Sequence, residues 1–98
     1  MMAALIMVRE GRDWQSSNAL FDWTLEYLIP RVTDEKTADW LRTIVEENLG
    51  SLWIPDLPPE AQEEIYVLLR ADLLRTAAQE LPEGAAVDQL RELVDLTY

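Results

Sequence analysis

The side chains that could do chemistry in this sequence are almost all carboxylates. The chain has 19 Asp and Glu residues, eight Lys and Arg residues, and neither His nor Cys. Without imidazole or thiolate, the common nucleophile–base pairs cannot be assembled, and zinc would lack its usual ligands. The three glycines are isolated, so no glycine-rich phosphate-binding loop is present.

Two adjacent acid pairs, Glu46–Glu47 and Glu63–Glu64, are the best candidates for holding a hard cation. The EF-hand pattern of alternating acids around a central glycine is missing, however. A carboxylate-only hydrolase would need a substrate cleft, which is hard to build from 98 mostly helical residues. We therefore predict no metal site, no cofactor and no enzymatic activity.

The charge of the chain restricts its partners. The net charge is −11, and Lys36 is its only lysine. Binding to nucleic acid or to an anionic membrane surface needs clustered Lys and Arg, which the sequence lacks. If charge selects a partner, we expect a basic protein. The alternative is that the acids only keep a small protein soluble.

The acids are concentrated between residues 34 and 64, where nine acids face two bases, a net charge of −7. Two of the four tryptophans, Trp40 and Trp53, lie in the same segment, and tryptophan is frequent at binding hot spots. For Trp53 we favour a place in the core, because its connection also carries Leu52, Ile54 and Leu57; for Trp40 both interpretations stay open. If a partner docks here, the predicted contact residues are Glu35, Asp39, Trp40, Glu46, Trp53, Asp56 and Glu60.

Apolar periodicity predicts an all-α fold, a compact bundle of four steeply crossing helices near residues 17–29, 34–49, 59–81 and 85–97. Ser16 or Ser17 would cap the first helix, and Thr33 the second. Gly50 would end the second helix, and Pro59 suits the first position of the third. The row Ala61, Ile65, Leu69, Leu73, Ala77 and Leu81 makes the third helix central.

Residues 1–16 are predicted to form an N-terminal arm on the helical core of residues 17–98, within a single domain of 1–98. The run "AALIMV" at residues 3–8 reads as a short strand with no sheet to join. We expect it to pack across the bundle or to pair in a homodimer through residues 1–8. It has no basic segment before it and is too short to span a bilayer, which favours a soluble cytoplasmic protein.

These features predict a small protein-binding module that inhibits or neutralises a basic macromolecular partner. Immunity proteins, antitoxins and phage-type inhibitors fit that description in size, charge and helix content, which is an analogy of physical type. The alternative is a structural or adaptor domain that acts by self-association, with acidity serving solubility only.

Overall fold

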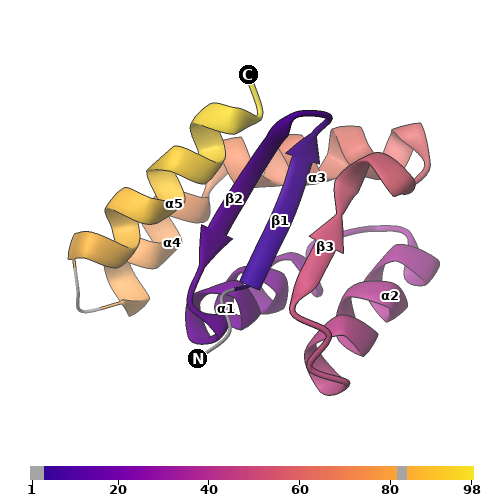
Figure 1. The fold of residues 1–98 in the computed structure, drawn as a ribbon, viewed down its shortest axis with the longest axis horizontal. Coiled ribbons are helices and arrows are strands. Elements are labelled where there is room, and N and C mark those ends of the chain that lie inside the picture. The colour runs from indigo at the N-terminus through magenta and orange to yellow at the C-terminus, as the bar shows by residue number, and fades with distance from the viewer. Residues whose placement is uncertain (1–3, 82–83) are drawn as a thin grey trace.

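The computed structural model describes residues 4–81 and 84–98, which form a mixed α/β fold (Figure 1). The all-α prediction is wrong, because helices surround a three-stranded sheet. The elements in chain order are β1 (Ala4–Arg9), β2 (Arg12–Ser16), α1 (Asn18–Leu28), α2 (Glu35–Glu46), β3 (Ser51–Trp53), the 3₁₀ helix η1 (Ile54–Asp56), α3 (Pro59–Ala71), α4 (Leu73–Glu80) and α5 (Gly84–Leu96).

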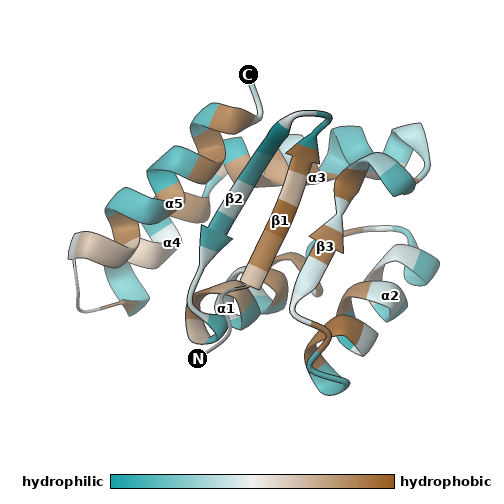
Figure 2. Ribbon diagram, viewed as in Figure 1, coloured by the Kyte–Doolittle hydropathy of each residue, from teal (hydrophilic) through white to brown (hydrophobic). Residues whose placement is uncertain are grey.

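The sheet has the strand order β2-β1-β3. β1 and β2 form an antiparallel hairpin, whose turn contains Gly11 at φ +81°, a conformation that glycine adopts without strain. β1 and β3 run parallel, with Leu5 opposite Ser51 and Met7 opposite Trp53. The apolar N-terminal run is therefore the central strand, and Figure 2 shows it mostly brown beside the largely teal β2.

Residues 4–16 of the predicted arm form this hairpin, and the expectation that its strand has no sheet to join is wrong. The two partner strands were not recognised in the sequence, because β2, "RDWQS", is polar and β3 has only three residues inside a proline-rich connection. β1 has neighbours along both edges, while residues 1–3 lie outside the described part of the chain. The homodimer through residues 1–8 stays a prediction.

The two faces of the sheet differ in burial. Residues on alternate positions of a strand point to opposite faces, and residues paired across strands share a face. The inner face carries the buried side chains Ala4, Ile6, Val8, Trp14 and Leu52. The outer face carries the half-buried Leu5 and Met7 and the exposed Asp13, Gln15 and Trp53. In Figure 1 the strands lie in front, and no helix crosses the face turned to the viewer.

Two of the predicted helix ends need correction. Ser17 caps α1 as predicted, its Oγ accepting from the Leu20 N–H at 3.2 Å. Asp34, not Thr33, caps α2 by accepting from the Thr37 N–H at 3.0 Å. α2 ends at Glu46, and the left-handed residue that follows its C-cap is Asn48, at φ +53°, not Gly50. Two bonds typical of a Schellman motif close the helix there, from Asn48 N to Val45 O and from Leu49 N to Ile44 O.

The predicted helix of residues 59–81 is two helices. α3 ends at Ala71 and α4 begins at Leu73, with Asp72 between them at φ −124°. A row at every fourth residue drifts by about 40° per step around a straight helix, so it turns away from the core within a few turns. The break at Asp72 restores the alignment, and both Leu69 and Leu73 are buried. Pro82 and Glu83, in the next connection, lie outside the described residues.

Two arginines tie the end of α5 to β1 and α3. Arg9 and Arg70 both donate from Nη2 to the carbonyl oxygen of Thr97. Arg9 also lies over the ring of Tyr66, 4.7 Å from its centroid, and the Tyr66 hydroxyl donates to the carbonyl oxygen of Val8. These contacts join the last helix to the central strand.

Candidate functional site

Two tryptophans line one groove on the surface between α2 and β3. Trp40 is 45% exposed and Trp53 is 46% exposed, although large apolar side chains are usually buried. The groove has a volume of about 380 Å³. We call it the tryptophan groove, and it is lined by Trp40, Leu49, Ser51, Trp53, Asp56 and Leu57.

The exposure of Trp53 follows from strand geometry. Leu52 and Ile54 on either side of it are fully buried, as expected. Trp53 lies opposite Met7 on the outer face of the sheet, where no helix covers it. The prediction that Trp53 belongs to the core is therefore wrong, because the three-residue strand that turns it outward was not recognised.

Trp40 is exposed because it lies at the margin of the buried side of α2. The buried residues of this helix are Thr37, Leu41 and Ile44. At about 100° per residue, Trp40 stands roughly 65–70° around the helix from the middle of that set. It therefore reaches the side of the groove, while α2 also contacts α1.

The predicted acidic residues divide into two groups. Asp56 lines the tryptophan groove. Glu35, Asp39 and Glu46 are exposed on α2, about 100–140° around the helix from Trp40, and Asp39 forms an ion pair with Arg42 at 2.7 Å. Glu60 is exposed in the first turn of α3 and does not line the groove.

Glu47 was considered from the sequence only as a cation ligand and was not among the predicted contact residues. It follows Trp40 by seven residues, which is about 20° short of two full helical turns, so it continues the same side of α2. Glu47 is exposed at the C-terminal cap of the helix. The spacing of seven residues from Trp40 was the sequence signal that could have placed Glu47 on the same side of the helix.

A second hollow adjoins Trp53 on the side of the β1–β2 turn. Its volume is about 240 Å³, and its lining is Met7, Glu10, Gly11, Trp53, Pro55 and Asp56. Trp53 and Asp56 line both hollows. The Trp53 indole and the Asp56 carboxylate therefore lie between the groove and this hollow, an arrangement suited to binding apolar and basic side chains of a partner.

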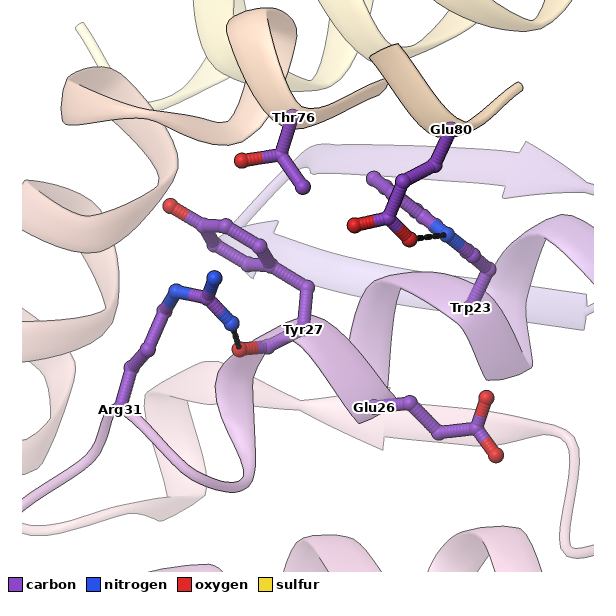
Figure 3. A pocket seen from close by; sticks show the side chains of 6 residues that line it. All are labelled: Trp23, Glu26, Tyr27, Arg31, Thr76 and Glu80. Atoms are coloured by element: carbon purple, nitrogen blue, oxygen red, sulfur yellow. Dashed lines mark hydrogen bonds between the residues drawn. The ribbon is translucent and has the colours of Figure 1, made fainter. Parts of the chain in front are cut away.

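A third, smaller pocket lies between α1 and α4 and is drawn in Figure 3. Its volume is about 160 Å³, and it is lined by Trp23, Glu26, Tyr27, Arg31, Thr76 and Glu80. Most of its polar groups bond to the protein itself. Trp23 Nε1 donates to Glu80 Oε1 at 3.3 Å, and Arg31 Nη1 donates to the Tyr27 carbonyl oxygen at 2.7 Å.

Tyr27 in this pocket is held as a neutral phenol. Its hydroxyl donates to the carbonyl oxygen of Leu68 at 2.7 Å, and burial raises its pKa despite the opposing charge of Arg31. A phenol with a raised pKa is a poor base at neutral pH. This pocket is accordingly best explained as a packing junction that fixes α4 to α1.

Within residues 4–81 and 84–98, no three acidic side chains gather in a way that would hold a metal ion. In the same ranges, every helix is too short or too polar to cross a bilayer.

Comparisons of this chain with protein-family models, with curated proteins and with solved structures found no match.

Proposed function

We propose that the chain is a small protein-binding module that holds and neutralises a basic protein partner at the tryptophan groove. The observation that carries the proposal is the pair of half-exposed tryptophans lining one groove together with Asp56. Tryptophans in such positions are the side chains that most often anchor protein interfaces. Solubility explains exposed acids but gives no reason for an exposed aromatic pair.

The charge distribution supports a basic partner. Asp56 is in the groove, Glu47 continues the side of Trp40, and Glu10 lines the neighbouring hollow. Complementary charge speeds the association of two proteins, and salt screens it. The exposed acids Glu35, Asp39 and Glu46 of α2 would contribute to this long-range attraction without direct contact.

The test is capture of basic proteins from the native host at low salt, followed by binding kinetics on each captured protein. Trp53→Ala and Trp40→Ala should each weaken binding by about 2 kcal/mol or more, mostly through faster dissociation. Val67→Ala is the matched control, because Val67 is 55% exposed on α3 and outside the groove. It should bind like the unsubstituted protein.

Charge reversal tests the electrostatic part separately. Replacing Asp56 and Glu47 by Lys should slow association and remove most of its salt dependence. The same two-charge change at Glu92 and Asp95, exposed on α5 across the molecule, should have a smaller effect. Equal effects of both pairs, or unchanged binding by both tryptophan variants, would exclude the groove as the docking site. Sedimentation of the purified chain would reveal the alternative, self-association.

A further inference from the structure

We propose that the outer edge of β3 receives an extended basic segment of the partner as a fourth strand of the sheet. This inference rests on the proposed function and specifies how the partner is bound. The observation behind it is that the tryptophan groove borders a strand edge whose backbone groups point away from β1.

The direction of these groups follows from one hydrogen bond. The Leu5 N–H donates to the carbonyl oxygen of Gly50 at 2.9 Å, so the backbone groups of Gly50 face β1. Backbone direction alternates along a strand, so Leu52 also faces β1 while Ser51 and Trp53 face the opposite side. Their two N–H groups and the Ser51 carbonyl oxygen thus point outward from the sheet, while the carbonyl oxygen of Trp53, the N-cap residue of η1, is engaged by the 3₁₀ turn that follows.

The three outward groups have no hydrogen-bond partner among the described residues. The N–H groups of Ser51 and Trp53 and the Ser51 carbonyl oxygen form no backbone hydrogen bond outside the strand ladder, and no side chain bonds to them. Strand edges in natural proteins are usually blocked by lysine, proline or a covering element. β3, "SLW", contains neither lysine nor proline.

The space beside this edge suits an added strand. Figure 1 shows β3 at the margin of the sheet with α2 beyond it, and the tryptophan groove lies between them. Ser51 and Trp53 form one side of the groove, while Trp40 and Leu49 come from α2 and the turn that follows it. An added strand would lie about 4.8 Å from β3 and be flanked by the two indole rings.

The chemistry of the groove selects a basic segment. Asp56 lines it, and the exposed Glu47 is at the C-terminal cap of α2, two residues before the groove residue Leu49. Arg42, on the same helix, is already paired with Asp39. Lys or Arg side chains at alternate positions of the incoming strand would meet these carboxylates and could stack on the indole faces. Backbone pairing would supply the remaining contacts, as in other strand-addition complexes.

The test uses a capped seven-residue peptide of alternating Arg and Val as the probe, titrated against the full chain. In an added strand, only alternate residues of the peptide direct their N–H groups towards β3. N-methylation of that alternate set should lower affinity by about tenfold or more, and N-methylation of the other set should leave it nearly unchanged. A Glu–Val peptide of the same length controls for charge.

Amide hydrogen exchange provides an independent readout on the protein. Binding of the Arg–Val peptide should slow exchange at Ser51 and Trp53, whose amides face the added strand, by about tenfold or more at saturation. The Leu52 amide faces β1 and serves as the internal reference.

The outcomes separate this inference from the proposed function. Equal binding of the two N-methylated peptides, absence of protection at Ser51 and Trp53, or no binding of the Arg–Val peptide would overturn strand addition. The first two results would leave side-chain docking in the groove intact. The groove itself is excluded as the docking site if the Trp40 and Trp53 variants bind the captured basic partner normally, or if the two charge-reversal pairs have equal effects.

Discussion

Trp14 and Trp53 lie on opposite faces of the same small sheet and have opposite surroundings. Trp14 is 3% exposed, and its Nε1 donates to the carbonyl oxygen of Gln89 in α5 at 2.8 Å. Trp53 is 46% exposed and lines two surface hollows. One indole holds a helix on the sheet, and the other presents its surface to solvent.

The difference shows that residue type alone does not separate a core tryptophan from a surface one. What decides is the parity of the residue along its strand and which face of the sheet the helices cover. Because α1 and α5 contact β1 from one side, the outer face keeps its apolar side chains partly accessible. The following predictions test this contrast, from the largest effect to the smallest.

The largest contrast should appear between two neighbours on β3. Leu52→Ala should lower the free energy of unfolding by about 2–5 kcal/mol, because Leu52 is fully buried on the inner face. Trp53→Ala should cost at most about 2 kcal/mol, since half of that side chain is already in water. Urea denaturation of both variants measures the difference. Equal losses would mean that the two faces are equally packed.

A second contrast compares the two indole N–H groups. Trp14→Phe should lower the free energy of unfolding by about 1–3 kcal/mol, because it removes the hydrogen bond from the indole to the Gln89 carbonyl oxygen and leaves a gap in the packing against α5. Trp53→Phe should change it by less than about 0.5 kcal/mol. Thermal denaturation followed by circular dichroism is the measurement. A stable Trp14→Phe variant would show that the α5 contact depends on shape rather than on the bond.

On the helical side of the sheet, the raised pKa of Tyr27 predicts that the free energy of unfolding decreases in alkali. Its pKa is raised chiefly by burial, so its contribution is complete below the ordinary tyrosine pKa of about 10 and is lost as the pH rises through the higher folded value. Tyr27→Phe should cost about 0.5–1.5 kcal/mol at neutral pH, and this deficit should shrink above about pH 10. Denaturation at pH 7 and in alkali checks the trend; a deficit independent of pH would contradict it.

The smallest effect concerns the helix that carries Trp40. Two hydrogen bonds from Thr37, from its hydroxyl and its backbone N–H, lower the pKa of Asp34. The stability from this cap is complete above the ordinary aspartate pKa of about 3.9 and is lost as the pH falls through the lower folded value. Asp34→Ala should lower the melting temperature at pH 7, and the difference in melting temperature from the unsubstituted protein should become smaller below pH 3. Asp34→Asn, which also caps helices, is the control.

The sequence was informative wherever helices carry long, regular patterns. The α1 and α2 regions were predicted within a few residues, and the row through Leu69 and Leu73 is buried as expected. The sequence did not predict the sheet, because a polar five-residue strand and a three-residue strand carry almost no periodic signal. Pairing of β1 with β3 depends on contacts between distant parts of the chain, which local propensity does not contain.

The candidate site was foreseen only in part. Trp40, Trp53 and Asp56 were chosen for their residue types, and the structure brings these three together. Leu49 and Ser51 could not be chosen, because their place in the groove depends on how the chain turns from α2 into β3. The acids of α2 were grouped with the tryptophans by closeness in sequence, whereas the helix turns them to another side.

The parallel pairing of β1 with β3 also bears on how the molecule folds. The β1–β2 hairpin joins residues that are close in sequence, but Leu5 and Ser51, which pair in the sheet, are 46 positions apart. Closing such a loop is entropically costly and slow compared with forming a hairpin. We therefore expect β3 to join the sheet late, after the hairpin and the first two helices. The tryptophan groove, which includes β3, would then be among the last parts of the protein to form and the first to open.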